Sequence, residues 1–186
     1  MPTLRPEELP NLIRSLVMSN LSLTTRCLIK WQLLTLERPA EASGTRWSEI
    51  NFDEKLWTIT AERMKAKREH IIPLSPQALD ILKVMSAISI NREHVLPSRN
   101  DPKKPMNSQT ANAALKRIEY GGKLVAHGMR SIASTALNEH GFNADVIEAT
   151  LAHTDKNEVR RAYNRSTNLQ KRVELMNWWS DFAMKK

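Results

Sequence analysis

Six polar residues, spread over most of the chain, have side chains that together could do chemistry on a phosphate diester. They are two arginines, a lysine, two histidines and a tyrosine: Arg38, Lys65, His127, Arg130, His153 and Tyr163. Arginine and lysine bind the non-bridging oxygens of a phosphate. A proton donor can serve the leaving oxygen, and a tyrosine hydroxyl can attack the phosphorus. The set predicts cleavage of a phosphodiester bond without a metal ion.

Four of the six residues lie in short motifs, His127-Gly-Met-Arg130, Leu-Ala-His153 and Arg-Ala-Tyr163-Asn-Arg. If the first motif is helical, His127 and Arg130 project from one face, about one turn apart. Taken singly, each residue has an ordinary interpretation: a helix-surface pair, a buried histidine with hydrogen-bond partners, or a core tyrosine. Their order and spacing together favour a site.

The overall charge suits a polyanionic partner. Lys and Arg number 28 against 20 acidic residues in a chain of 186, which gives a formal net charge of +8. Neutralised phosphates release counterions and add affinity that does not depend on sequence, although a protein that is merely basic would show the same balance. The single cysteine, Cys27, excludes an internal disulfide. No apolar run is long enough to span a membrane and no signal peptide is evident, so we expect a soluble, cytoplasmic protein.

The elements that must position these residues are mostly helical. Residues Leu9, Leu12, Ile13, Leu16 and Val17 recur at helical spacing after a cap-like Thr3. A second helix is predicted over 23–37, with Leu28, Trp31 and Leu34 or Thr35 buried. Because the residue before a proline is pushed out of the α region, Arg38 should lie at a break between two helices, where it can point into a cleft.

From residue 48 to 75 the pattern changes to short strands. Residues 56–60 alternate and are rich in β-branched side chains, and 70–74 form another apolar run. We predict an antiparallel sheet of two or three strands, with a turn at 51–55 and a basic hairpin tip at 62–69. Helical patterns then resume at 76–90, 108–118, 127–140, 143–151, around Tyr163, and at 167–184. In the last helix one stripe is predicted to hold Leu169, Val173, Met176, Trp179 and Ala183. The predicted fold class is α+β, mainly α-helical, in one domain of about this length.

The ordered motifs closely resemble the tyrosine recombinase (phage integrase) family, and most closely the integrases of P4-like prophages and genomic islands. The resemblance covers nearly the whole chain. It includes Arg38-Pro-Ala-Glu41, a hairpin lysine, His127-Gly-Met-Arg130, Leu-Ala-His153 and Ala-Tyr163-Asn-Arg. Further similarities are Arg46-Trp-Ser-Glu-Ile-Asn51, Met64-Lys65 ahead of His70-Ile-Ile-Pro-Leu-Ser75, and Leu175-Met-Asn-Trp178.

The resemblance implies a role for each residue. Arg38 and Arg130 would clamp the scissile phosphate, and Tyr163 would form a 3′-phosphotyrosyl link. Lys65 would protonate the departing 5′ oxygen, with Lys67 as the alternative. His127 would assist proton transfer at the tyrosine, and His153 would bond a phosphate oxygen. The hairpin residues Lys65, Lys67 and Arg68 would contact DNA. Covalent storage of the phosphodiester implies no requirement for ATP, metal or any other cofactor.

Three features of the sequence leave questions open: Glu41, the pair Leu36-Glu37, and the motif Leu-Ala-His153. Glu41 could orient Arg38 or be an ordinary surface acid. The small turn residues usual before the first arginine are replaced by Leu36-Glu37, and we expect Glu37 to face away, because an inward carboxylate would weaken the clamp. The motif Leu-Ala-His153 departs mildly from the family's frequent glycine. No position of the six is lost, so we expect an intact active site.

The resemblance also implies a wider setting. Family integrases carry an N-terminal arm-binding segment and a core-binding domain, so we expect residues 1–186 to be the catalytic domain, with weak or no complete recombination alone. Expected partners are double-stranded DNA attachment sites, a homotetramer on DNA, an excisionase and a host DNA-bending protein, at the bacterial nucleoid. The free domain should be a monomer. The last helix, with Trp178, Trp179 and Phe182, either packs on its own domain or docks on a neighbouring protomer.

Two other functions remain open from the sequence. A type IB topoisomerase shares this chemistry and a related fold, and would relax supercoiled DNA without strand exchange. A DNA-binding prophage remnant would keep the basic surface but lack the chemistry. The P4-like wording of the motifs argues against the first, and the full residue set argues against the second.

Overall fold

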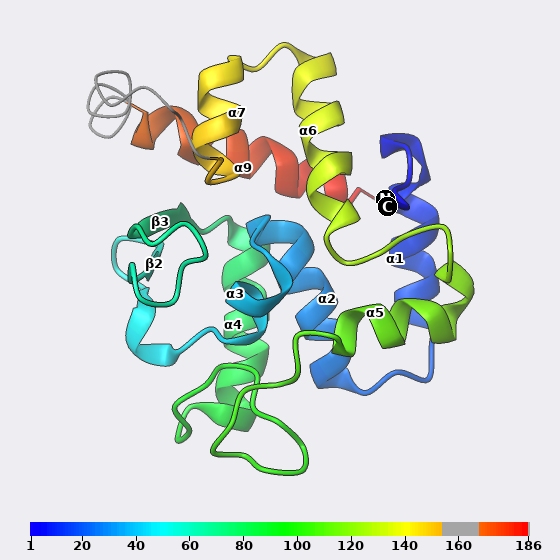
Figure 1. Cartoon of the computed structure of the whole chain (residues 1–186), viewed down its shortest axis with the longest axis vertical. Coiled ribbons are helices and arrows are strands. Elements are labelled where there is room, and N and C mark those ends of the chain that lie inside the picture. The colour runs from blue at the N-terminus through cyan, green and yellow to red at the C-terminus, as the bar shows by residue number, and fades with distance from the viewer. Residues whose placement is uncertain (154–167, 186) are drawn as a thin grey trace.

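The computed structural model describes residues 1–153 and 168–185, and it confirms the predicted α+β class (Figure 1). Helix α2, Leu23–Thr35, packs against α3, α4, α5, α6 and α9. From Cys27 onward every residue of α2 except Lys30 is buried. The predicted face of Leu28, Trp31, Leu34 and Thr35 is therefore buried, together with residues on the other sides of a helix that is surrounded.

The chain begins with a segment that crosses the start of a distant helix. A 3-10 turn, Pro6–Glu8, leads into α1, Leu9–Met18, whose buried residues are Leu9, Leu12 and Leu16. The prediction that Thr3 caps this helix is wrong. The turn is capped at Arg5, and the Thr3 hydroxyl instead donates 2.9 Å to the carbonyl oxygen of Gly128. The nearest partner of that hydroxyl comes from the opposite half of the sequence.

The predicted break at Arg38 is confirmed. Helix α2 ends at Thr35, two residues earlier than predicted, because Leu36 adopts a left-handed conformation with φ of 61°. Arg38 is extended, with φ −67° and ψ 153°, and it is the N-cap of the short helix α3, Pro39–Ser43. The proline occupies the first helical position, where its missing amide hydrogen costs nothing.

The sheet has three antiparallel strands in the order β1-β2-β3, as predicted: Ile50–Asn51, Leu56–Ile59 and His70–Pro73. Ile59 pairs with His70, so residues 60–69 form the loop that joins β2 to β3. Met64, only 1% exposed, anchors this segment in the core. Lys65 follows Met64 directly and is exposed.

The remaining helices confirm the predicted types, with shifts at their ends. They are α4, Pro76–Ser89; α5, Thr110–Leu115, continued by a π turn at Lys116–Tyr120; α6, Gly128–His140; α7, Ala144–Thr150; and α9, Leu169–Ala183. In Figure 1, α6, α7 and α9 lie together on one side of the molecule, and the sheet lies on another. The helix predicted around Tyr163 lies outside the described residues.

Helix α9 packs on its own domain. Trp179 is fully buried, and its indole nitrogen donates 2.8 Å to the carbonyl oxygen of Leu33 in α2. Trp178 stacks on His140 at 4.2 Å between ring centroids, and on Phe182. The predicted buried stripe is wrong at Leu169, which is exposed at the start of the helix. Within the described residues, no helix is both long and apolar enough to cross a membrane.

Candidate active site

Arg130 is the most deeply buried of the predicted site residues that the structure describes. It projects from the first turn of α6 and is 4% exposed. Its Nη1 donates to the carbonyl oxygen of Leu36, and its Nη2 donates to that of Leu151. Leu36 ends the helix before Arg38, and Leu151 lies two residues before His153. The guanidinium group therefore joins the backbones that carry two other predicted site residues.

Arg38 and Lys65 meet at one carboxylate. The Glu41 side chain, 3% exposed, lies 3.6 Å from Nη1 of Arg38 and accepts from the Arg38 backbone amide at 3.3 Å. Its other oxygen accepts from the Lys65 backbone amide at 3.1 Å. Of the two interpretations of Glu41, the structure favours the orienting residue over the surface acid. Burial raises the pKa of Glu41, and the Lys65 amide opposes that effect.

Glu37 is inward-facing, so the expectation that it faces away is wrong. Its side chain is fully buried, and its Oε1 lies 3.1 Å from Nε2 of His70. Although burial raises its pKa, His70, Arg130 and Glu41 outweigh that effect, and the net pKa is lowered. The carboxylate points into the core, where His70 and Arg130, basic side chains from distant elements, act on it.

His127 shows that the cationic residues converge. It is the N-cap of α6 and is exposed. Its pKa is lowered first by partial burial of the ring and then by the charges of Arg130, Arg38, His153 and Lys65. Since electrostatic effects on a pKa fall off with distance, these four side chains lie near one imidazole. Five of the six predicted residues are therefore brought together, while Tyr163 lies outside the described residues.

His153 is held by a carboxylate that the sequence analysis missed. Its Nδ1 lies 2.7 Å from Oε2 of Glu148, on the last turns of α7. A carboxylate on Nδ1 accepts the Nδ1 proton and fixes the ring. Nε2 is then an acceptor in the neutral ring and a donor only in the imidazolium form. The spacing of five residues, Glu148 to His153, is the signal that could have found it.

The two candidate lysines of the hairpin tip, Lys65 and Lys67, have different surroundings. Lys65 is tethered to Glu41 through its backbone and acts on the pKa of His127. Lys67 is exposed, has a positive φ of 52°, and its amide donates 3.0 Å to the carbonyl oxygen of Met64. Arg68 follows it and is half-buried. Of the two lysines, the structure thus ties Lys65 through its backbone amide to the carboxylate beside Arg38.

The site has free capacity for an anion. Among the residues that the structure describes, Nη1 of Arg38 has no hydrogen-bond partner although the atom is buried. Burial lowers the pKa of Arg130, and the nearby Glu37 is the charge that most offsets this. A guanidinium stays charged at working pH. The arrangement can therefore bind a phosphate between two fixed cations.

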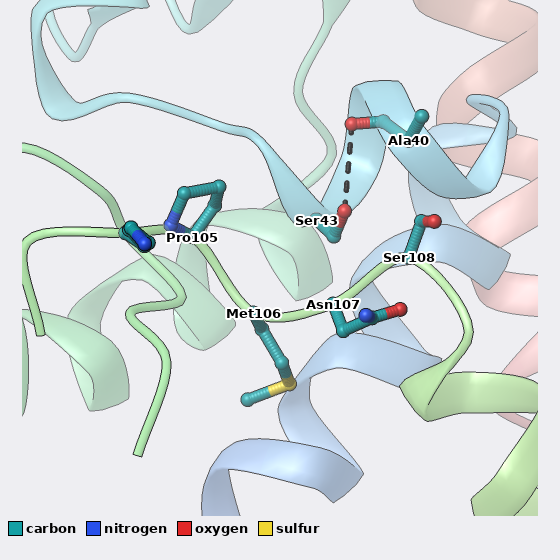
Figure 2. A pocket seen from close by; sticks show the side chains of 7 residues that line it. Ala40, Ser43, Pro105, Met106, Asn107 and Ser108 are labelled. Carbon is teal, nitrogen blue, oxygen red and sulfur yellow. Dashed lines mark hydrogen bonds between the residues drawn. The ribbon is translucent and has the colours of Figure 1, made fainter. Parts of the chain in front are cut away.

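A separate pocket of about 400 Å³ lies between α3 and the loop before α5 (Figure 2). It is lined by Ala40, Ser43, Lys104, Pro105, Met106, Asn107 and Ser108. None of the five predicted site residues that the structure describes lines it. A duplex is bound across a surface, so this hollow is separate from the site described above.

The chain matches known sequences along almost its whole length. The sequence profile of the Phage integrase family matches residues 2–170. Prophage integrase IntA of Escherichia coli (strain K12) is 59% identical over 183 residues, covering 98% of this chain and 44% of that protein. The integrase of Enterobacteria phage P4 is 36% identical over 197 residues, covering 97% of this chain and 45% of that protein. The chain thus spans less than half the length of these curated relatives.

Solved structures share the fold. A lambda integrase tetramer bound to a Holliday junction aligns with a TM-score of 0.63 at 17% identity, covering 84% of this chain and 48% of that one. At this identity the likeness concerns the fold alone. The predicted catalytic-domain fold of the tyrosine recombinases is confirmed.

Proposed function

This chain belongs to the phage integrase family, and from that premise we propose that residues 1–186 form the catalytic domain of a site-specific tyrosine recombinase. The observation that supports this most strongly is the gathering of Arg38, Lys65, Arg130 and His153 around His127. These residues come from separate elements, and a phosphodiester is the group whose charge and leaving oxygen would use all of them.

In the proposed reaction the Tyr163 oxygen attacks the scissile phosphorus of double-stranded DNA. The Tyr163 proton passes to His127, a tyrosyl–phosphorus bond forms, and the bond from phosphorus to the 5′ oxygen breaks. Lys65 gives a proton to that oxygen, which leaves as a 5′ hydroxyl. Attack by a 5′ hydroxyl on the phosphotyrosine reverses these bonds and rejoins a strand. The energy of the diester is kept in the covalent link.

The described residues support the electrostatic part of this scheme. Arg130 is held by two carbonyl oxygens, and Arg38 is held by Glu41 while its Nη1 lacks a hydrogen-bond partner among the described residues. Donors that are already oriented stabilise the charge of a transition state without reorganisation at the moment of reaction. His153, whose Nδ1 faces Glu148, would bond another phosphate oxygen through Nε2–H in its imidazolium form.

The wider assembly belongs to the same proposal. We propose that the whole protein integrates or excises a prophage or genomic island at DNA attachment sites, as a homotetramer, in the bacterial cytoplasm at the nucleoid. The lambda integrase tetramer on a Holliday junction supports the tetramer. An excisionase and a host DNA-bending protein would set the direction. The basic balance of 28 Lys and Arg against 20 acidic residues supports the DNA partner.

The test is a nicked suicide duplex, in which the strand beyond the cleavage point diffuses away and the covalent product accumulates. The wild-type chain should give a covalent protein–DNA band. Tyr163→Phe should give none, because the nucleophile is lost, and Arg130→Ala should give none because the clamp is lost. Lys67→Ala, on the same hairpin, should only weaken the band.

Three outcomes would count against the proposal. A covalent band that persists in Tyr163→Phe would exclude Tyr163 as the nucleophile. Relaxation of supercoiled plasmid by the longer parent protein, without strand exchange between attachment sites, would indicate a type IB topoisomerase instead. DNA binding with no covalent band for the wild-type chain would indicate a non-catalytic remnant.

A further inference from the structure

Glu37 is a buried carboxylate with no assigned role in the reaction. It lies in the three-residue connection between α2 and α3, after left-handed Leu36 and before Arg38. Its side chain is 0% exposed. Removing an ionised carboxylate from water costs several kcal/mol unless cations or hydrogen bonds compensate. The groups that face Glu37 should therefore show what it does.

Three basic side chains from three separate elements act on this carboxylate. Nε2 of His70, the first residue of β3, lies 3.1 Å from Oε1 of Glu37. Arg130 of α6 acts on Glu37 through its charge. Arg172 of α9 has its pKa lowered to about 10 by burial, and Glu37 offsets that effect. The remaining charged neighbour is Glu41 of α3, whose carboxyl group also acts on Glu37.

Each of these three side chains lies on, or is bonded to, an element that carries or borders a residue of the proposed reaction. His70 closes the hairpin whose tip carries Lys65, since it pairs with Ile59 at the end of β2. Arg130 is half of the phosphate clamp. Arg172 donates from Nη2 to the carbonyl oxygen of Ile71, and so joins the start of α9 to the same strand as His70.

The hydrogen bonds of Arg130 leave a charge to be balanced. Nη1 and Nη2 donate to the carbonyl oxygens of Leu36 and Leu151, which are neutral acceptors. Among the charges that act on Arg130, Glu37 is the largest favourable one. The carbonyl oxygens of Leu36 and Leu151 set the direction of the Arg130 guanidinium. Glu37 accepts neither of these two hydrogen bonds and acts on Arg130 through its charge.

We propose that Glu37 is a positioning residue for strand cleavage, whose carboxylate fixes Arg130 and, through His70 and Arg172, aligns the Lys65 hairpin and α9 with the phosphate clamp. This inference rests on the proposed function, because Arg130 and Lys65 are taken as the clamp and the general acid. It assigns Glu37 a supporting effect on the clamp rather than competition with the phosphate.

The test is Glu37→Gln, which removes the charge at nearly constant size. With the suicide duplex at saturating protein, the single-turnover rate of covalent-complex formation should fall by a factor on the order of 100, as expected when reacting groups are slightly misplaced. The dissociation constant for DNA should change little, because surface phosphate contacts remain. Glu37→Asp keeps the charge and should recover part of the rate. Glu139→Gln, an exposed acid on α6, is the matched control and should be unchanged.

A folding defect is separated from a positioning defect by two further measurements. Thermal unfolding fixes a temperature at which every variant is folded, and all rates are taken there. If Glu37→Gln does not fold, His70→Gln removes the other partner of the 3.1 Å contact and should slow cleavage in the same way. If both single variants fold, the double variant should lose less than the sum of the two single losses, because the groups are coupled.

The outcomes separate this inference from the proposed function. If the wild-type chain gives no Tyr163-dependent covalent complex, the proposed function fails first. If it does, and folded Glu37→Gln cleaves as fast as wild type, Glu37 has no positioning role. If folded Glu37→Gln cleaves faster than wild type, the Glu37 carboxylate weakens the phosphate clamp, and the inference is wrong.

Discussion

The carboxylate of Glu41 accepts a hydrogen bond of 3.1 Å from the backbone amide of Lys65, across 24 positions of sequence. The same carboxylate lies 3.6 Å from Nη1 of Arg38. One buried side chain therefore holds a residue of the predicted clamp and the turn that presents the predicted general acid. Glu41 thus sets the distance between Arg38 and the Lys65 turn, although Glu41 itself takes no part in the proposed reaction.

Replacement of Glu41 by glutamine should affect both partners. An amide keeps one acceptor oxygen but loses the charge opposite Arg38, and its NH₂ group faces donors. We expect the free energy of unfolding to fall by about 1–3 kcal/mol, and cleavage of the suicide duplex to slow as well. Denaturant unfolding and single-turnover rates measure the two effects. Glu54→Gln, at an exposed acid, should change neither; an unaltered cleavage rate in Glu41→Gln would contradict the linkage.

The two hairpin lysines can be separated by the chemistry of the leaving group. Lys65→Ala should slow cleavage by about 10²–10⁴-fold if Lys65 is the general acid. A duplex with sulfur in place of the bridging 5′ oxygen should restore the rate, because a thiolate leaves without a proton. Lys67→Ala should be slowed slightly, by the same factor on both substrates. Rescue of Lys67→Ala by sulfur, and not of Lys65→Ala, would exchange their assignments.

His127 should titrate below its ordinary range. Partial burial of the ring and then nearby charges, those of Arg130 and Arg38 first, lower the pKa of His127 from 6.5, so neutral His127 persists to a lower pH than a free imidazole. As pH falls, the unfolded chain binds this proton first, and the folded state loses stability between the unfolded and the folded pKa. NMR titration of the ring measures the value. In Lys65→Ala the pKa should rise, because one cation is removed; a fall would contradict the proximity of the two side chains.

The start of α6 leaves no space for a side chain at Gly128. A Cβ built there would lie 2.5 Å from the carbonyl oxygen of Pro2, and Thr3 donates to the Gly128 carbonyl oxygen at 2.9 Å. Gly128→Ala should lower the free energy of unfolding by about 1–3 kcal/mol. Thr3→Val should cost about 0.5–1.5 kcal/mol, the usual value of one hydrogen bond. Thermal unfolding measures both, with Thr58→Val as the control. An alanine tolerated without loss would mean that the N-terminal segment moves aside.

Local pattern was sufficient where an element depends on its own residues. The proline after Arg38 predicted the break, because its ring disfavours a helical residue before it. The alternation at 56–60 predicted a strand, and the helical spacings predicted the types of the later helices. Local pattern was insufficient at Thr3, whose hydroxyl bonds to Gly128 instead of capping the first helix. It was also insufficient at Leu169, because burial of a leucine depends on neighbours that are distant in the sequence.

The sequence by itself determined the residue types of the site, their order, and the family to which they belong, because these are properties of the chain in one dimension. Only the tertiary structure decided that Glu37 turns inward, that Glu41 joins Arg38 to Lys65, and that Glu148 holds His153. Side-chain direction at a break between helices follows from which charges lie within a few ångströms. Those charges come from β3, α6 and α9, and folding alone brings them there.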